Sequence, residues 1–239
     1  ANGVRLVGRS FKYHRPRGIM TAGSEEPNAV VQLEEGARTE PNTRATVTEL
    51  YDNLSAASQN CWPSVEFDVG ALNAKLSRFF PAGFYYKTFM WPAKLWEPVY
   101  EKVIRKAAGM GKSPMATDPD SYAQQFAHCD VLIAGGGPAG LAAALAAGES
   151  GARVILADEG PEFGGSLLGD TAEIAGIPAA DWVAQTVQRL EAMDEVTLLP
   201  RTTVTAYYDH NLLTALERVT DHLGPQRDDA VPRQRFWKI

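Results

Sequence analysis

The chain contains few of the residues that build metal and redox centres. Its 239 residues include two cysteines, Cys61 and Cys129, and four histidines. No C-x-x-C, C-x4-C or H-x-x-x-H pattern occurs, so neighbouring residues cannot form a zinc site or a redox-active disulfide. The low cysteine content is typical of proteins in a reducing compartment, and we therefore expect a cytoplasmic protein.

Long apolar segments and an excess of basic residues are also missing. No apolar run approaches the roughly 18 residues that a membrane-spanning helix needs, so no membrane partner is expected. The formal net charge is -6, which argues against a general nucleic-acid-binding protein. Hydrophobic residues make up 45% of the chain, which is ordinary for a globular protein of one large or two modest domains.

A glycine-rich turn near the middle of the chain is its most informative feature. An apolar run from Cys129 to Ala134 leads into a G-x-G-x-x-G pattern, and an alanine-rich helix is expected over Leu141 to Glu149. The residues of the turn are Gly135, Gly136, Gly137, Pro138, Ala139 and Gly140. A strand, this turn and a helix in this order predict a Rossmann-like α/β dinucleotide-binding domain.

Each glycine of the motif has a physical reason to lack a side chain. Gly135 allows the sharp turn out of the strand, Gly137 leaves room for a pyrophosphate, and Gly140 lets the helix approach the sheet closely. The pyrophosphate would lie at the N-terminus of the helix, where unpaired N–H groups and the positive end of the helix dipole attract anions.

An acidic residue follows the turn at the expected distance. The next apolar run, Arg153 to Ala157, ends at Asp158 and Glu159. Asp158 is the eighteenth residue after Gly140, near the ~20-residue spacing of a carboxylate that accepts hydrogen bonds from the adenosine ribose. Because glycine turns also recur for structural reasons, a Rossmann-like unit without a nucleotide is the alternative interpretation.

Composition divides the chain into three regions. Residues 1–60 are expected to form a small β-rich domain, and residues 129–239 the Rossmann-like domain. Residues 61–128 form a connector in which nine of the 22 aromatic residues of the chain fall between positions 79 and 100. Aromatic residues are enriched at interfaces, so we expect the connector to pack against a domain or subunit rather than to stack on nucleic-acid bases.

Smaller elements are expected within these regions. Strands are predicted over 28–33, 45–51, 196–199 and 202–208, and helices near 98–108 and over 181–193. Residues 211–222 fit either a helix or a hairpin. Residues 236–239 resemble a strand that stops in mid-course, and the chain begins without Met, so we expect a fragment in which both domains are truncated.

Three blocks of sequence carry a resemblance to a known family. They are Arg9 to Gly23, Phe80 to Pro92, and the glycine turn from Gly135 to Gly140. Together they resemble the α subunit of heterotetrameric sarcosine oxidase, and the resemblance runs along the whole chain. The first two blocks are specific, whereas the glycine turn alone would fit many flavoproteins.

The resemblance implies the later part of a ferredoxin-like domain at the N-terminus. In relatives that carry a cluster, the segment after Pro16-Arg17-Gly18 supplies C-x4-C-x2-C. The matching positions here are Thr21, Glu26 and Ala29. The resemblance therefore implies that this domain has no iron–sulfur cluster.

The same resemblance assigns a nucleotide and partners to the chain. It implies an NAD site in this subunit, with FAD and FMN elsewhere in the complex, and a flavin-bearing β subunit and smaller subunits as partners. The candidate cofactor-binding residues are Gly135, Gly137, Pro138, Ala139 and Gly140 for the pyrophosphate, Asp158 for the ribose, Glu159, Gly160, Gly165 and Ser166 of the following loop, and Val204 for the adenine edge. No residue is a candidate catalytic group or metal ligand.

The expected function follows from this assignment. The complete complex would oxidise an N-methyl amino acid, sarcosine, through flavins to oxygen, giving glycine, a one-carbon unit and hydrogen peroxide. This chain alone is expected to have no turnover. Two alternatives remain: an FAD-dependent reductase of the disulfide-reductase fold, against which the missing cysteine pair counts, and a non-catalytic dinucleotide-binding scaffold subunit.

Overall fold

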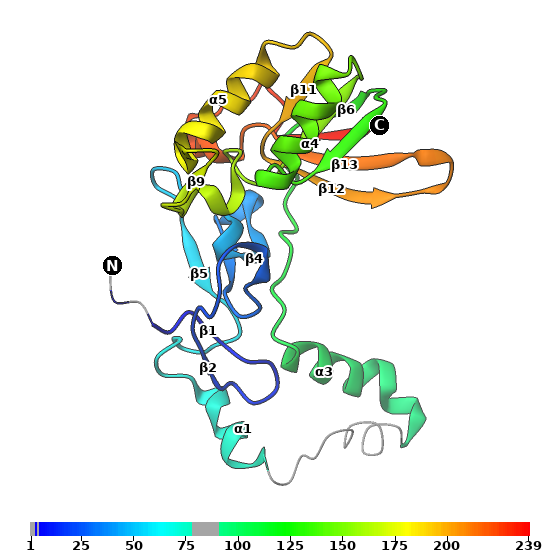
Figure 1. The fold of residues 1–239 in the computed structure, drawn as a ribbon. Helices are drawn as coiled ribbons and strands as arrows, with labels where there is room; N and C mark the ends of the chain where they lie inside the picture. The colour runs from blue at the N-terminus through cyan, green and yellow to red at the C-terminus, as the bar shows by residue number, and fades with distance from the viewer. Residues whose placement is uncertain (1–2, 4, 78–90) are drawn as a thin grey trace. The chain divides into compact units, whose positions relative to one another are not determined.

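The computed structural model describes residues 3, 5–77 and 91–239. The chain forms two compact units, Ala1–Pro119 and Asp120–Ile239, which are drawn in Figure 1. The second unit therefore begins within the segment that the sequence assigns to the connector. Most of the aromatic block, from Phe80 to Phe89, lies outside the described residues.

The first unit contains two small antiparallel sheets. In the first sheet, β1 (Gly8–Arg9) pairs with β2 (Pro16–Arg17). In the second, β3 (Val30–Leu33) lies between β4 (Glu40–Arg44) and β5 (Ala56–Ser58). Single 3-10 turns at Gly23–Glu25, Gly36–Arg38 and Ala45–Val47 connect these strands.

The strand expected over 28–33 is confirmed by β3, but the strand expected over 45–51 is wrong. Residues 45–47 form a 3-10 turn instead. The hydroxyl of Thr46 donates to Gly23 O at 2.7 Å, and that of Thr48 donates to Arg44 O at 2.9 Å. Threonine hydroxyls that bond to the backbone in this way favour turns over strands, which the alternation of polar and apolar residues could not reveal.

The helices of the first unit are short. Among the described residues, those after β5 are η4 (Val69–Ala71), α1 (Leu72–Lys75), η6 (Ala93–Leu95), the π turn η7 (Trp96–Tyr100) and α3 (Glu101–Ala107). The helix expected near 98–108 is thus confirmed by α3. Pro98 has no N–H to donate, and the turn around it closes through a bond from Glu101 N–H to Trp96 O. Gly109, with φ of 68°, follows the last turn.

A buried carboxylate fixes the loop that precedes β3. Glu26 is 1% exposed, and its carboxylate accepts hydrogen bonds from the N–H groups of Met20 at 2.5 Å, Thr21 at 2.8 Å and Asn28 at 2.7 Å. The bond from Thr21 is the largest cause that lowers the pKa of Glu26, and it acts against burial, which raises this pKa. The loop is therefore organised around a negative charge.

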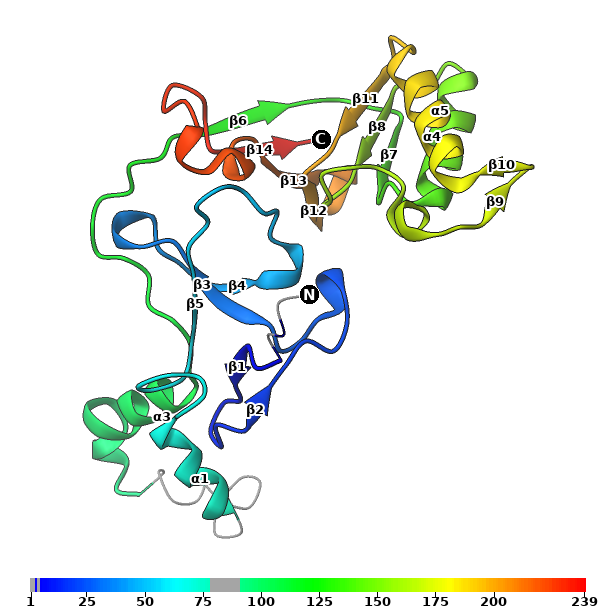
Figure 2. The ribbon, with the colours of Figure 1, turned by 90° about the vertical axis from the view of Figure 1, so that its left-hand side faces the viewer.

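A parallel sheet and two helices form the centre of the second unit. The strand order is β11 (Val196–Leu199), β8 (Val154–Ala157), β7 (Val131–Ala134). Helices α4 (Pro138–Glu149) and α5 (Ala179–Glu191) cover one face of this sheet, as Figure 2 shows. Leu141, Leu156 and Leu190 are fully buried between these layers. This architecture fits the expected Rossmann-like α/β fold.

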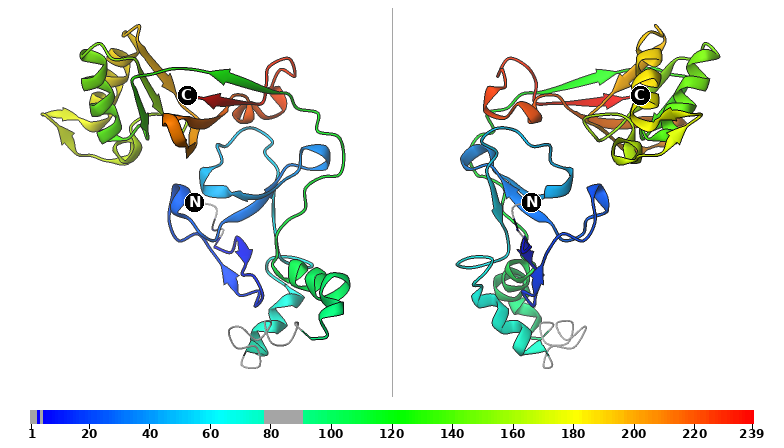
Figure 3. Two further views of the ribbon diagram at one scale, coloured as in Figure 1. Left: turned by 90° about the vertical axis from the view of Figure 1, so that its right-hand side faces the viewer. Right: turned by 60° about the vertical axis from the view of Figure 1, so that its left-hand side comes forward.

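A second sheet packs on the other face of the parallel sheet. Its order is β12 (Thr202–Tyr207), β13 (Leu213–Arg218), β14 (Gln234–Lys238), β6 (Tyr122–Phe126). β14 runs parallel to β6, and the red and green arrows lie side by side in Figure 3. Ala215 and Trp237 of this sheet contact Ile155 and Ala157 of the first.

Short elements complete the second unit. The segment 211–222, which fitted a helix or a hairpin, contains strand β13 of a hairpin with β12. The remaining elements are η8 (Gly165–Gly169), β9 (Glu173–Ile174), β10 (Ile177–Pro178), η9 (Asp209–Asn211) and η10 (Asp221–Gln226). Within the described parts of the chain, no helix has the length and apolar character needed to cross a membrane.

Replacing Glu26 by Gln should destabilise the first unit, because one amide N–H2 group would face the N–H donors that the carboxylate now satisfies. The lowered pKa of Glu26 means that its stabilisation is present above the ordinary pKa of 4.5 and is lost as the pH falls through the lower folded value. We expect a lower Tm for Glu26→Gln at pH 7 and a smaller loss of Tm on acidification than in the unsubstituted protein. The exposed neighbour Glu25 supplies the control, Glu25→Gln, for which both quantities should stay unchanged.

Candidate dinucleotide site

The glycine turn joins strand β7 to helix α4. Gly135 donates its N–H to Ala157 O at 2.8 Å, at the end of the pairing between β7 and β8. Its φ of 105° lets the chain turn there. Gly137 is the N-cap of α4, and Pro138 is the first helical residue. Gly137 has no side chain with which to accept the first N–H groups of the helix. A bound anion can therefore take the place of the capping group.

The glycines differ in what surrounds the missing side chain. A Cβ on Gly140 would lie 1.9 Å from Gly135 O, so the close approach of helix and turn requires glycine there. A Cβ on Gly136 would lie 2.3 Å from the ring of Phe163. A Cβ on Gly137, in contrast, would meet no atom within 4 Å. Gly140 thus serves the packing of the protein, whereas Gly137 borders open space at the helix N-terminus.

Asp158 connects the end of β8 to the glycine turn. Its Oδ2 accepts from Gly136 N at 2.5 Å, and its Oδ1 accepts from Gly160 N at 2.7 Å. A carboxylate offers about four lone-pair sites, so two sites remain for the hydroxyl groups of a ribose. The structure therefore brings the predicted ribose acid beside the predicted pyrophosphate turn.

The loop after Asp158 folds over the turn. Gly164 N donates to Gly136 O at 2.8 Å, and a Cβ on Gly165 would lie 3.0 Å from Gly137 Cα. Gly165 has φ of 54°, which favours glycine. Gly165 and Ser166 are exposed, while Phe163 is buried beneath them. The loop at Gly165 thus lies close to Gly137, and Ser166 is the next residue.

Val204 is placed differently from the other candidate residues. Its side chain packs with Ile155, Ala157 and Leu199 against the face of the parallel sheet that turns away from α4. Gly135 to Gly140, Asp158 to Gly160, and Gly165 with Ser166 are brought together. The contact of Val204 with an adenine edge stays a prediction.

Two arginines that no sequence pattern indicated lie against the same loop. Arg218 donates through Nη2 to Glu159 O, and Arg201 N donates to Gly160 O at 2.8 Å. Arg218 N in turn donates to Arg201 O at 3.0 Å. Glu159 itself is exposed. These contacts arise from the β12–β13 hairpin, and no motif spacing could have indicated them.

Comparison with known proteins agrees with this geometry. Residues 130–214 match a family described as FAD dependent oxidoreductase, and residues 1–61 match a family described as 2Fe-2S iron-sulfur cluster binding domain. Over 239 residues, the whole chain is 59% identical to sarcosine oxidase subunit alpha of Rhizobium meliloti (strain 1021). The chain is related along its whole length to sarcosine oxidase subunit alpha. The predicted resemblance is therefore confirmed.

The relationship covers only part of the relatives. The chain aligns with 24% of the Rhizobium meliloti subunit alpha and, at 36% identity, with 20% of the subunit alpha of Corynebacterium sp. (strain U-96). Among solved structures, L-proline dehydrogenase from P. horikoshii is similar in fold, with a TM-score of 0.51 and 14% sequence identity. The alignment covers 99% of this chain and 34% of the dehydrogenase chain. That likeness shows the fold alone. The relatives are thus named as subunits of an oxidase, and the family that matches residues 130–214 is described as FAD dependent.

The match at the N-terminus corrects one prediction. The absence of an iron–sulfur cluster was inferred from three positions, Thr21, Glu26 and Ala29, whereas the match to a cluster-binding family extends over residues 1–61. The prediction is contradicted by that match. The donor set of this segment does not fit a cluster held by four thiolates, since its one cysteine is Cys61. Among the described residues, no group of three or more His, Cys, Asp or Glu side chains could hold a metal ion.

Gly137→Val should abolish nucleotide binding while leaving the second unit folded. The new side chain would fill the space at the helix N-terminus, and we expect affinity to fall by more than about 100-fold, equivalent to about 2.8 kcal/mol. The free energy of unfolding should change by no more than about 1 kcal/mol, as for other positions without steric conflict. Nucleotide titration and denaturant unfolding measure the two effects.

Gly140→Ala is the matched control for this variant. Its Cβ would collide with Gly135 O, so we expect it to lower the free energy of unfolding by about 1–3 kcal/mol, as overpacking does. Unchanged nucleotide affinity in Gly137→Val would show that the turn has been misassigned.

Proposed function

We propose that the second unit binds the ADP portion of an adenine dinucleotide, and that the complete protein is the alpha subunit of an oxidase that acts on sarcosine. One observation carries the nucleotide part of this proposal. The N-terminus of α4 has no side-chain cap and faces the open side of Gly137, with the carboxylate of Asp158 held beside it. A diphosphate and a ribose diol are complementary to these two groups.

Two nucleotides share this ADP portion. The resemblance of the sequence implied NAD, whereas the family that matches residues 130–214 is described as FAD dependent. The turn and Asp158 would contact only the ADP half, which both molecules have in common, so we propose an adenine dinucleotide at this site. When bound, either cofactor would supply the capacity to accept electrons from an amine.

The residues of this chain would position the cofactor rather than react with the substrate. The first N–H groups of α4 would bind the pyrophosphate, Asp158 would orient the ribose, and the loop from Gly160 to Ser166 would cover the turn. Arg218 would hold that loop in place through Glu159 O. We propose no residue of this chain as a catalytic acid, base or nucleophile.

The named relatives support the proposed substrate and partners. Sarcosine oxidase subunit alpha of Rhizobium meliloti is 59% identical to this chain, so we propose that the complete protein oxidises sarcosine, an N-methyl amino acid. Because the relatives are named as subunits, we propose that the complete protein is part of a hetero-oligomer. We propose a flavin-bearing subunit as one partner, since electrons taken from the amine must pass to oxygen.

The nucleotide bound to the complete protein should decide between the two cofactors. We expect one adenine dinucleotide per chain after purification, identified by its absorption spectrum and by the mass of the compound released on denaturation. Flavin bands lost with Gly137→Val would assign FAD to this turn, and colourless NAD lost with the same variant would assign NAD. A protein that retains its nucleotide in Gly137→Val, or never contains one, would contradict the proposal.

A scaffold role is tested by the same preparation. Addition of sarcosine without oxygen should reduce the flavin of the complete complex, which is visible as bleaching of its absorption bands. A bound nucleotide and flavin that both stay oxidised would favour the non-catalytic scaffold.

A further inference from the structure

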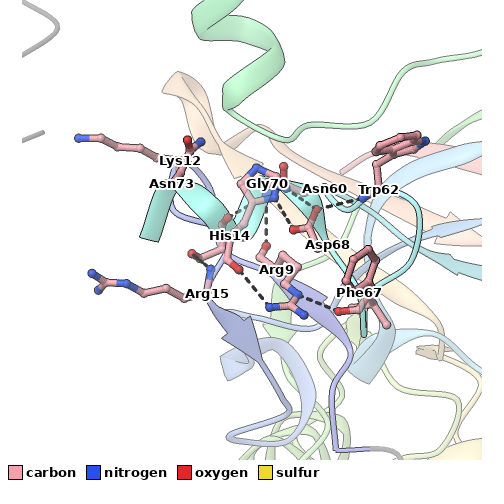
Figure 4. A network of polar contacts seen from close by, with 12 residues as sticks. Arg9, Lys12, His14, Arg15, Asn60, Trp62, Phe67, Asp68, Gly70 and Asn73 are labelled. Atoms are coloured by element: carbon pink, nitrogen blue, oxygen red, sulfur yellow. Dashed lines mark hydrogen bonds and ion pairs between the residues drawn. The ribbon is translucent and has the colours of Figure 1, made fainter. Parts of the chain in front are cut away.

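The hairpin between β1 and β2 in the first unit ends in an unusually well-fixed tip, residues 10–15. Arg9, at the base of the tip, donates through Nε to Val65 O at 2.7 Å and through Nη2 to Glu66 O at 2.9 Å. Its Nη1 donates to His14 O at 3.2 Å, within the tip itself. The guanidinium thus ties the tip to the segment around residue 65 (Figure 4).

A histidine and an aspartate provide the second attachment. His14 Nδ1 lies 2.6 Å from Asp68 Oδ2, and the two side chains are 17% and 1% exposed. The other oxygen, Asp68 Oδ1, accepts from Trp62 N at 3.1 Å and Gly70 N at 3.0 Å. These two bonds hold the Asp68 carboxylate in place independently of its bond to His14. Asn60 Nδ2 adds a bond to Ser10 O at 2.8 Å.

These attachments hold the backbone in a conformation that it would not otherwise favour. Lys12 has φ of 60° and His14 has φ of 51°. Left-handed backbone is unfavourable for residues other than glycine and persists where surrounding contacts impose it. Asn73 Nδ2 donates to Lys12 O at 3.2 Å. Such imposed conformations are concentrated at sites that present side chains to a ligand.

Two cations of the tip lie close to one aromatic ring. Lys12 Nζ lies 4.8 Å and Arg15 Cζ 4.9 Å from the centre of the Tyr13 ring. Figure 4 shows Lys12 and Arg15 extending to the same side, away from Trp62 and Phe67. Residues 1–24 contain five Arg or Lys and no Asp or Glu. Within the part of the chain that the structure describes, Arg15 takes part in no ion pair with an acidic side chain.

We infer that this hairpin tip is a preformed docking site for an acidic surface of another polypeptide in the complex. The inference rests on the proposed function in that it supposes partner subunits. Tyrosine and arginine are enriched among the residues that carry binding energy at protein interfaces, and opposite charge selects carboxylates. The cavity of about 240 Å³ next to β1 is lined by Arg9, Phe11 and Arg17, among others, but not by Lys12, Tyr13 or Arg15.

The test uses the complete protein and the subunits that copurify with it. Lys12→Glu/Arg15→Glu reverses both charges, and the affinity for partner subunits is measured over a range of NaCl concentrations. We expect at least about tenfold weaker association at low salt and a smaller dependence of affinity on salt, because opposed charges no longer attract. Lys102→Glu/Lys106→Glu makes the same charge change at exposed positions of α3 and should leave both quantities unchanged.

A second variant tests the role of the fixed backbone. His14→Gln keeps Lys12, Tyr13 and Arg15 but removes the imidazole that holds the tip to Asp68. We expect a smaller loss of affinity, with an unchanged salt dependence, because the attracting charges remain. Unfolding measurements on each variant confirm that the first unit is folded.

Two results would overturn the inference. One is partner association by Lys12→Glu/Arg15→Glu with the affinity and salt dependence of the unsubstituted protein. The other is a lower free energy of unfolding of that variant in the absence of partners, since the acidic surface would then belong to the same chain. The bound nucleotide is measured in parallel: its retention in all of these variants separates this inference from the assignment of the dinucleotide site.

Discussion

The second unit depends on how closely helix α4 can approach the end of strand β7. The contact is made between Gly140 and the carbonyl of Gly135, where a methyl group would lie 1.9 Å from the oxygen. This approach sets the position of the helix N-terminus at the edge of the parallel sheet. Asp158, at the end of the neighbouring strand, can then reach the N–H of Gly136 at 2.5 Å. The proposed anion site and the proposed ribose acid therefore both depend on one backbone contact.

The two units are stabilised by different interactions. The second unit buries an apolar layer between α4, α5 and the sheet, so its cohesion comes largely from hydrophobic burial. The first unit has a few short strands, and polar side chains hold its loops by bonding to the backbone. Glu26 binds three N–H groups, and Asn42 and Gln59 exchange bonds of 2.6 and 2.9 Å. Loops fixed in this way keep exact positions without a large core.

Local patterns in the sequence predicted the parts that depend on neighbouring residues. The glycine turn, the acid at position 158 and the amphipathic helix expected over 181–193 correspond to the turn, Asp158 and α5. What escaped prediction depends on contacts between distant residues. Arg218 reaches Glu159 only because β12 and β13 form a hairpin, and His14 meets Asp68 across 54 positions. The spacing of residues along the chain does not indicate such pairings, because they depend on how whole elements are arranged in the fold.

The parallel pairing of β6 with β14 has a consequence for the order in which the second unit can form during synthesis. β6 ends at Phe126 and β14 begins at Gln234, and β6 is the edge strand of its sheet. On the ribosome, chains grow at about 5–20 residues per second. The backbone groups of β6 therefore stay hydrogen-bonded to water for several seconds, until β14 has been synthesised. The α4–α5 layer can assemble in that interval. The first strand of this unit to be made is thus among the last to join its sheet.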